Sequence, residues 1–269
     1  MSRNALRPFL LALLATPILL AGCGRDSARD LAGPPADATL SREADATHGS
    51  APNYVLPRVM FVHASPDAPA VDIKSGWRTL ARNLGFLDNT PYRLLLPGYR
   101  EIKINVAGTR TTALRARVKL EPRTIYSVFA VNTVSNLEPL VLVDDLSPPA
   151  PGNAHVRFIH LSPDAPAVDV AVQGGPVVFG NKSFKEYTAF TPLPAGTYDL
   201  EVRLAGTSTV VLPLPGIGLE AGKIYTVFAK GLVAGSGDQA LGAAIVINSD
   251  EFRRWHHGAG AEPVADLER

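Results

Sequence analysis

The sequence lacks most of the residues and motifs by which chemistry is recognised in a protein chain. It has one cysteine and two methionines among 269 residues, so no disulfide can form within the chain. It contains no Gly-x-Ser-x-Gly, His-Glu-x-x-His or Cys-x-x-Cys motif and no phosphate-binding loop. Serine hydrolases, zinc proteases, redox proteins and nucleotide-binding proteins usually show these motifs. We therefore predict no enzyme activity, no cofactor and no metal centre.

An excess of either charge is also missing. The chain carries 26 basic and 25 acidic residues, for a net charge of +1. Nucleic acids and anionic lipid surfaces attract proteins through clustered positive charge. The balance gives no reason to expect such a partner, and we predict that the protein binds no nucleic acid.

One long apolar run is present, and it lies at the N-terminus. It extends from Phe9 to Leu20, interrupted by Thr16 and Pro17, and follows a basic segment with Arg3 and Arg7. The run is shorter than the ~20 residues that span a bilayer, and its form is typical of a secretory signal peptide. We predict a signal peptide over residues 1–22.

The signal ends in Leu20-Ala21-Gly22-Cys23, which resembles a bacterial lipobox. The resemblance implies cleavage before Cys23 and lipid attachment to its thiol; the alternative is an ordinary signal peptide that happens to place a cysteine there. Gly24 follows where an aspartate would indicate retention in the inner membrane. We predict an exported lipoprotein, anchored to a membrane through Cys23, in the outer membrane, periplasm or cell surface if the host is Gram-negative.

Residues 23–53 are poor in bulky apolar side chains and rich in Ala, Gly, Asp, Ser and Pro. Such a segment cannot bury enough apolar surface to offset the entropy of ordering. We predict a disordered tether over residues 23–53, and a polar tail over residues 251–269.

An internal repeat dominates the rest of the chain. The segment 59–73 returns as 156–170, at an offset of 97, and 120–130 returns as 219–229. The order is kept, so we predict two copies of one domain, over residues 54–147 and 154–250. The connecting segment contains Pro148, Pro149 and Pro151, which makes it semi-rigid and leads us to expect the domains end to end.

Each copy reads as a series of short strands. Ile102, Ile104 and Val106 alternate with polar residues, the pattern of a strand with one buried face. Segments 125–131 and 224–229 are apolar on both faces and are expected to be central strands. Tyr126 and Tyr225 each lie six residues after a leucine, as in the tyrosine corner of immunoglobulin-like sandwiches.

The fold class that follows is all-β. We predict two tandem immunoglobulin-like or fibronectin-like antiparallel β-sandwiches, of about seven strands each, behind the lipoprotein signal peptide and the tether. In this arrangement Tyr126 and Tyr225 have a structural role.

The motif His-x-Ser-Pro-Asp-Ala-Pro-Ala-Val-Asp occupies residues 63–72 and 160–169. Ser-Pro-Asp is a turn signature, and we interpret the motif mainly as a connection between two strands. Its polar residues also allow a triad-like cluster or a metal or ligand site, with weak candidates in His63, Asp67 and Asp72 and, in the second copy, His160, Asp164 and Asp169. Both copies keep these residues, which favours structure over catalysis.

Four aromatic residues form a second candidate. Trp77, Tyr99, Phe179 and Tyr198 are able to form a platform on which sugars stack. Aromatic residues at strand spacing usually lie in the core, and that is the position we expect for these four.

The repeated motif, with Leu-Pro-Ala-Gly-Thr-Tyr at 193–198 and Ile-Tyr-Thr-Val-Phe at 224–228, resembles a family of secreted bacterial β domains known as domain of unknown function 4397. The resemblance covers roughly residues 57–248. It implies an exported tandem β protein and adds no mechanism. At Leu96-Pro97-Gly98-Tyr99 the first copy departs from the family pattern, so the hairpin there is expected to differ.

Together these features predict a lipid-anchored envelope protein that is not an enzyme and that binds an envelope protein or a glycan or has a structural role. The alternative is a pair of ligand- or metal-binding domains that use the repeated motifs, and a hydrolase ranks below both.

Overall fold

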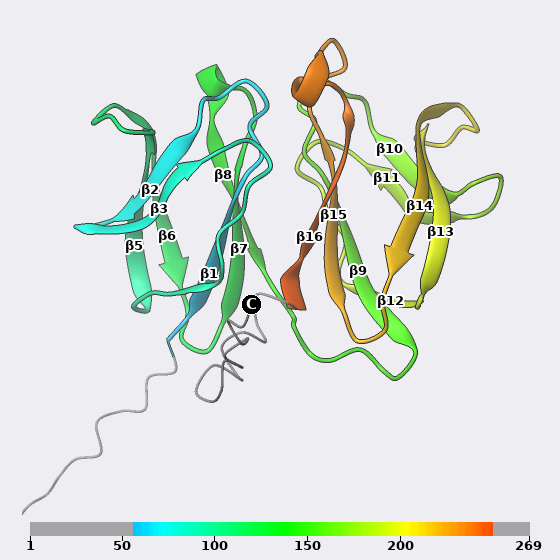
Figure 1. Ribbon diagram of the computed structural model, residues 1–269, viewed down its shortest axis with the longest axis horizontal. Coiled ribbons are helices and arrows are strands. Elements are labelled where there is room, and N and C mark those ends of the chain that lie inside the picture. The colour runs from blue at the N-terminus through cyan, green and yellow to red at the C-terminus, as the bar shows by residue number, and fades with distance from the viewer. Residues whose placement is uncertain (1–55, 250–269) are drawn as a thin grey trace, which may run out of the picture. The chain divides into compact units, whose positions relative to one another are not determined.

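The computed structural model describes residues 56–249, which form two β-rich repeats (Figure 1). The first repeat contains β1 (Arg58–His63), β2 (Val71–Ser75), β3 (Arg78–Leu84), β4 (Arg93–Leu94), β5 (Gly98–Val106), β6 (Thr112–Leu120), β7 (Ile125–Val131) and β8 (Glu138–Val143). The second contains β9 (Asn153–His160), β10 (Val168–Val172), β11 (Val177–Lys182), β12 (Thr191–Pro194), β13 (Gly196–Leu204), β14 (Val210–Leu219), β15 (Ile224–Lys230) and β16 (Gly242–Ile247). Short 3-10 turns, η1 (Val134–Asn136) and η2 (Gly237–Gln239), precede β8 and β16.

The predicted signal peptide, Cys23, the tether and the tail lie outside the described residues. Lipid attachment and the domain limits therefore stay predictions. In the part of the chain that is described, no helix is both long and apolar enough to cross a membrane.

Each repeat is a sandwich of two four-stranded sheets, which confirms the predicted all-β class. Sheet A has the order β4-β1-β7-β8 and sheet B the order β3-β2-β5-β6; sheets C and D of the second repeat have the orders β12-β9-β15-β16 and β11-β10-β13-β14. The pairing is mainly antiparallel, as predicted, with one parallel pair in each copy: β1 pairs in parallel with β7, and β9 with β15. Parallel neighbours need a long connection, which the intervening strands provide.

The period-two pattern explains the core of each sandwich. On β5, Ile102 and Ile104 are buried while Glu101 is exposed. The inner face of β5 joins the inner faces of β1, β2 and β7 in one apolar cluster. The second repeat has an equivalent cluster. Burial of this alternating face is what selects the register, because a slip by one residue would turn the apolar set to solvent.

The central strands are apolar on both faces because they serve two cores. On β7, Val128 faces the core of its own sandwich, whereas Phe129 joins a cluster shared with the second repeat. Phe129 meets Phe228 of β15 edge to face, with ring centroids 6.0 Å apart. Sheets A and C thus pack against each other, and the expectation that the domains lie end to end was wrong.

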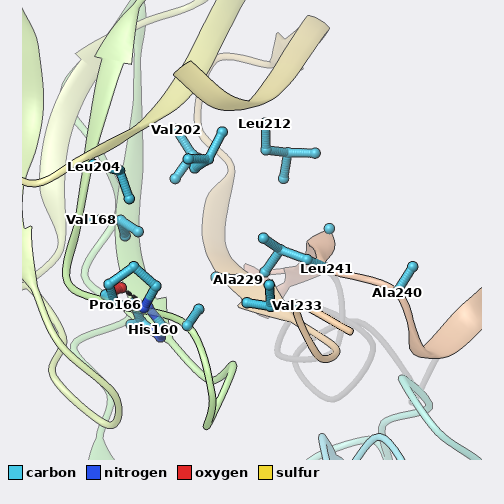
Figure 2. A pocket seen from close by; sticks show the side chains of 13 residues that line it. His160, Pro166, Val168, Val202, Leu204, Leu212, Ala229, Val233, Ala240 and Leu241 are labelled. Carbon is cyan, nitrogen blue, oxygen red and sulfur yellow. Dashed lines mark hydrogen bonds between the residues drawn. The ribbon is translucent and has the colours of Figure 1, made fainter. Parts of the chain in front are cut away.

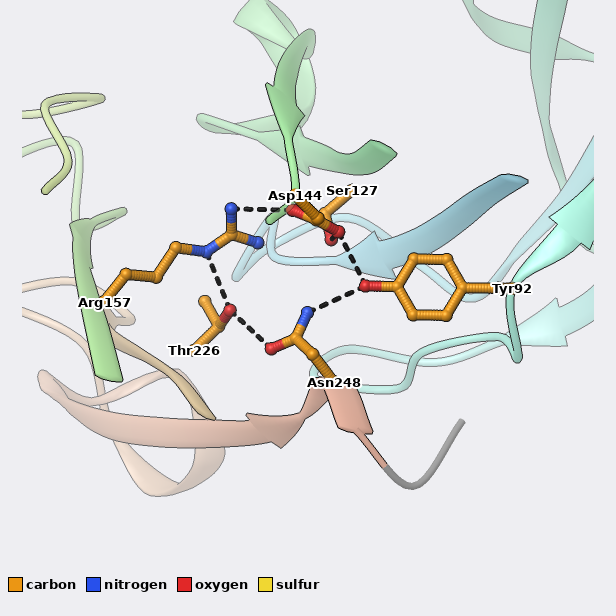
Figure 3. Close-up of polar contacts among 6 residues, drawn as sticks. All are labelled: Tyr92, Ser127, Asp144, Arg157, Thr226 and Asn248. Atoms are coloured by element: carbon orange, nitrogen blue, oxygen red, sulfur yellow. Dashed lines mark hydrogen bonds and ion pairs between the residues drawn. The ribbon is translucent and has the colours of Figure 1, made fainter. Parts of the chain in front are cut away.

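A buried polar network crosses this shared core (Figure 3). Arg157, which is 2% exposed, places Nη1 2.7 Å from Oδ1 of Asp144. The other carboxylate oxygen of Asp144 accepts hydrogen bonds of 2.6 Å from Tyr92 and from Ser127. Burial and the neighbouring carboxylate raise the pKa of Tyr92 well above its ordinary value, so its hydroxyl stays a neutral donor.

The second repeat closes the network. Arg157 Nε donates to the hydroxyl of Thr226 (2.8 Å), which donates to the amide oxygen of Asn248 (2.7 Å). The amide nitrogen of Asn248 donates in turn to the Tyr92 hydroxyl (3.0 Å). The Arg157 guanidinium also lies 4.5 Å from the centre of the Phe190 ring. A buried charge is stable only when paired and hydrogen-bonded. These contacts engage Nη1 and Nε of Arg157, whereas its Nη2 is buried without a hydrogen-bond partner.

The two repeats contribute different side chains to the network, although they have the same fold. Met60 pairs with Ser127 in sheet A at the register position where Arg157 pairs with Thr226 in sheet C. Asp144 follows β8 as Asn248 follows β16. One copy therefore supplies the anion and the other the cation.

Both tyrosines of the predicted corners have the same surroundings. The hydroxyl of Tyr126 accepts a hydrogen bond of 2.9 Å from the backbone N–H of Glu121, and that of Tyr225 accepts one of 3.0 Å from Glu220. Each bond ties the turn before a central strand to that strand. The contribution of these bonds to stability stays a prediction.

We expect the ion pair in the shared core to show strong coupling. Arg157→Met places the first repeat's residue in the second and leaves the Asp144 carboxylate buried without a cation, which should cost about 3–5 kcal/mol. Asp144→Asn should also destabilise the protein, by leaving the guanidinium unpaired. The double variant should be more stable than either single variant, because well-packed neutral replacements of a buried pair are often nearly neutral.

Urea unfolding of the four proteins measures this coupling. Lys119→Met, which breaks an exposed ion pair of 2.7 Å with Glu121, is the control and should leave the midpoint unchanged. Strictly additive losses for Arg157→Met and Asp144→Asn would show that the two side chains do not depend on each other.

Candidate functional site

The most exposed aromatic side chain named in the described part of the chain lies at the tip of the β2–β3 hairpin. Ser75 pairs with Arg78, so Gly76 and Trp77 form a two-residue turn. Gly76 has φ +56°, which glycine adopts without strain and which the first position of such turns requires. The turn projects Trp77 into solvent, and its side chain is 93% exposed. The expectation that Trp77 lies in the core was wrong.

Trp77 lines a groove of about 380 Å³ on the first repeat, which we call the Trp77 groove. Its walls come from the β2–β3 hairpin, from the turn before β5 and from the start of β5: Ser75, Gly76, Trp77, Arg78, Leu80, Leu95, Leu96, Tyr99, Arg100 and Glu101. Tyr99 is 58% exposed, also against expectation, and Arg117 lies 4.3 Å from the centre of its ring.

The charged residues of the groove differ in whether they are already engaged. Arg100 donates to the carbonyl oxygens of Leu96 and Pro97 and so holds the turn before β5. The ammonium group of Lys103 lies 2.9 Å from Oε1 of Glu101, and this contact lowers the pKa of the Glu101 carboxyl group.

Arg78, in contrast, makes no hydrogen bond or ion pair through its side chain within residues 56–249. Its five N–H donors are therefore available to a ligand in the groove.

The second repeat does not reproduce this site. Its β10–β11 turn contains Gly174 and Gly175 in place of Gly76 and Trp77, and Thr197 stands where the first repeat has Tyr99. Of the other two aromatic candidates, Phe179 is buried against Phe158. Tyr198 donates its hydroxyl hydrogen to the carbonyl of Pro194 (2.7 Å). The four aromatic candidates therefore do not form one platform.

The two motif histidines are buried in equivalent positions. His63 Nε2 lies 3.0 Å from the carbonyl oxygen of Pro69, and His160 Nε2 lies 3.1 Å from that of Pro166. Because a carbonyl only accepts, Nε2 carries the hydrogen in each ring. Each Nδ1 is buried without a hydrogen-bond partner, as is the hydroxyl of Ser65. The side chains of His63 and Ser65 are thus not hydrogen-bonded to each other, and they do not form part of a catalytic triad.

The motif carboxylates are occupied by backbone groups. Asp67 accepts from the N–H of Val134 at 2.7 Å, and Asp164 accepts from Val233 at 2.9 Å. Each bond fastens the motif to the loop that precedes the last strand of its repeat.

The last aspartate of each motif has a similar position. Asp72 accepts from the N–H groups of Asn83 (2.9 Å) and Gly108 (3.3 Å). The bond from Asn83 lowers the pKa of the Asp72 carboxyl group. Asp169 accepts from Asn181 (2.6 Å) and Gly206 (2.8 Å). Throughout residues 56–249, no group of three His, Cys, Asp or Glu side chains is placed to hold a metal ion.

The sequence patterns did not predict most of the Trp77 groove. No sequence pattern indicated Leu96 or Arg78 as a candidate, and Trp77 and Tyr99 were expected in the core. The signal that could have found the site is the pair Gly76-Trp77 between two alternating segments, because a two-residue turn places its second residue at the tip of a hairpin.

The buried histidines predict a pH dependence of stability. Burial lowers the pKa of His63 and of His160 below 6.5, so the unfolded chain takes up these protons at a higher pH than the folded protein. Their contribution to stability is complete above about pH 6.5 and falls as the pH drops through the lowered values.

Melting temperatures from about pH 7.5 to about pH 5 measure this effect. The variant His63→Gln/His160→Gln keeps an N–H donor at each site but does not titrate, and its melting temperature should fall less over this range. Equal falls in the two proteins would contradict the assignment.

Comparison with known proteins gives a family and no activity. A family model described as Domain of unknown function (DUF4397) matches residues 57–171 and 163–252. No curated protein matches the chain.

Among solved structures, a similar one is CBMbc, a family CBM26 module from Eubacterium rectale Amy13K in complex with maltoheptaose. It is 6% identical, with a TM-score of 0.24 over 71% of this chain and 95% of that one. A likeness at this TM-score carries no argument. The family model, in contrast, spans both repeats and more than half of the chain, and the chain therefore belongs to the DUF4397 family.

Proposed function

We propose that this protein is a lipid-anchored, non-enzymatic binding module of the bacterial cell envelope, and that its first repeat binds a glycan in the Trp77 groove. The observation that carries the proposal is the position of Trp77, which is 93% exposed at a hairpin tip beside the exposed ring of Tyr99. A large aromatic side chain in water forfeits the free energy that its burial would give. An exposed apolar patch of this kind commonly marks a binding surface.

The chemistry of the groove suits a sugar. The apolar C–H face of a pyranose ring stacks on an aromatic face, and its hydroxyl groups need donors and acceptors at the edge. Trp77 and Tyr99 offer the rings, and the unengaged guanidinium of Arg78 offers donors. Trp, Tyr and Arg are also the residues that most often dominate binding energies.

The predicted envelope location supports the same proposal. A lipid on Cys23 would hold the sandwiches near a surface rich in glycans, and a tether of about 30 residues would have an r.m.s. span of about 30 Å.

Cys23→Ser should move the protein from the membrane fraction to the soluble fraction, and retention of that variant in the membrane would contradict the anchor.

The motif residues do not carry the proposed function. His63, Asp67 and Asp72 have backbone partners within their own repeat, which leaves little chemistry for a ligand. This occupation supports a binding module whose specificity lies outside the repeated motif.

Binding of polysaccharides tests the glycan site. Affinity electrophoresis with soluble β-glucan, xylan, α-glucan and alginate should find one that retards the protein. Trp77→Ala should weaken that binding by at least about 2 kcal/mol, or roughly thirtyfold in Kd, and Tyr99→Ala by a smaller factor. Since Trp77 and Trp255 are the two tryptophans, Trp255→Phe leaves Trp77 as the fluorescence reporter for the titration.

Tyr187 provides the matched control, because it is 51% exposed on the second repeat, away from the groove. Tyr187→Ala should bind like the wild type. Equal binding by Trp77→Ala and wild type, with both proteins folded, would place any glycan site elsewhere.

A further inference from the structure

Positive charge is concentrated on the outer face of sheet B, although the chain as a whole is nearly neutral. Ile102 and Ile104 of β5 point into the sandwich core, so the residues that alternate with them point to the other side of the sheet. Residues directly opposite each other on neighbouring strands share a side. We call that side the basic face and define it by five cations on β2, β5 and β6: Lys74, Lys103, Arg115, Arg117 and Lys119.

Three of these cations form a row across the sheet. Lys74 lies opposite Lys103, and Lys103 lies opposite Arg115. Neighbouring strands are about 4.8 Å apart, and like charges directly opposite each other destabilise a sheet. Within residues 56–249, Lys74 forms no ion pair. The row therefore works against the stability of the sheet, which favours a role in binding.

Carboxylates beside the basic face offset only part of its charge: Glu101, Asp72 and Glu121. Glu101 lies 2.9 Å from Lys103 and 3.5 Å from Arg115, so one carboxylate serves two cations. Asp72 is buried and accepts hydrogen bonds from backbone N–H groups. Glu121 lies 2.7 Å from Lys119 at the end of β6. An excess of positive charge is left on the surface of the sheet.

The basic face continues into the Trp77 groove. Tyr99 and Glu101 line the groove, and in the sheet they lie opposite Lys119 and Arg117. The Arg117 guanidinium lies 4.3 Å from the centre of the Tyr99 ring, so the face and the groove share a wall. A ligand that stacks on Tyr99 would meet the cations as soon as it extends along the sheet.

The second repeat has no equivalent of this row. The same register positions in sheet D hold uncharged or acidic residues: Ala171, Glu201 and Pro213. A cavity of about 530 Å³ in this repeat is lined by apolar residues and His160 (Figure 2). Burial lowers the pKa of His160, so this side chain is neutral at pH 7. The fold does not require the row, and the row lies on the repeat that carries the proposed glycan site.

We infer that the glycan bound by the first repeat is a linear polyuronate, with sugar rings in the Trp77 groove and carboxylates on the basic face. This inference rests on the proposed function and adds the class of glycan to it. The guanidinium of arginine binds a carboxylate through two parallel N–H donors. A polymer with one carboxylate on each sugar presents its charges in a line, as the row of Lys74, Lys103 and Arg115 does.

An anionic membrane surface is the competing partner for such a face. Lipid head groups offer negative charge but no ring that would stack on Trp77 and Tyr99. The continuity of the basic face with exposed aromatic rings therefore favours a polysaccharide.

Titration calorimetry with polygalacturonate and with alginate tests the inference. Fully methyl-esterified polygalacturonate has the same sugar backbone without the charge, and the wild type should bind it at least about tenfold more weakly. That difference should shrink as the salt concentration rises, because salt screens exposed charges. Lys74→Gln/Arg115→Gln should weaken polyuronate binding by roughly tenfold or more and leave binding of the ester unchanged.

Arg93→Gln/Lys182→Gln is the matched control, because it removes the same two charges from sheets A and D. It should bind polyuronates like the wild type. Urea unfolding should give similar midpoints for both double variants, since exposed ion pairs contribute little to stability. Equal binding by the two double variants, equal affinity for polygalacturonate and its ester, or no binding of either polyuronate to the folded wild type overturns the inference.

Trp77→Ala separates this inference from the proposal on which it rests, because it should weaken the charged polymer and the ester alike. A neutral polysaccharide that binds through Trp77, with no binding of polyuronates, supports the groove and overturns the polyuronate. Polyuronate binding that needs Lys74 and Arg115 but not Trp77 supports the class of glycan and contradicts the groove.

Phosphatidylglycerol vesicles test the competing partner. Cosedimentation that Lys74→Gln/Arg115→Gln abolishes, without polyuronate binding, would assign the basic face to an anionic membrane surface and overturn the inference.

Discussion

The packing of sheet A against sheet C is the constraint on which the rest of the structure depends. Their central strands serve a sandwich core on one face and the shared core on the other, so neither repeat can lose the other without exposing side chains such as Phe129 and Phe228. The buried pair of Arg157 and Asp144 makes this contact specific. Two first repeats would oppose Asp144 with Met60 and leave a carboxylate buried without a cation, which is strongly unfavourable. The duplication has thus produced two copies that fit each other better than either fits itself.

The motif residues that the two repeats share have structural roles. The surface openings that could admit a ligand differ between the repeats. The motif histidines and aspartates bond to backbone atoms in both repeats alike. The exposed Trp77 belongs to the first repeat, and an apolar cavity lined by Leu204 and Leu212 belongs to the second. Once two copies of a fold exist, one can keep the strand pairing while the other changes its edges and turns. The proposed glycan site is a difference of this kind.

Much of the fold was predictable from sequence, because burial repeats with the period of a strand. The alternation around Ile102 and Ile104 predicted β5, and the unbroken apolar segment 125–131 predicted a central strand. The contact between repeats was not predictable, since a proline-rich linker limits freedom without giving a direction. The Trp77 groove was missed because the turn, rather than the side chain, decides that Trp77 is exposed.

The most direct test of the shared core is native-state hydrogen exchange at increasing denaturant, followed at amides of β7 and β15. If the shared core joins the two repeats into one cooperative unit, the amide hydrogens of Phe129 and Phe228 will exchange with the same free energy of opening and the same denaturant dependence. If β15 opens at a clearly lower free energy than β7, with its own smaller dependence on denaturant, the repeats unfold independently. That result would contradict the central role of the packing of sheet A against sheet C.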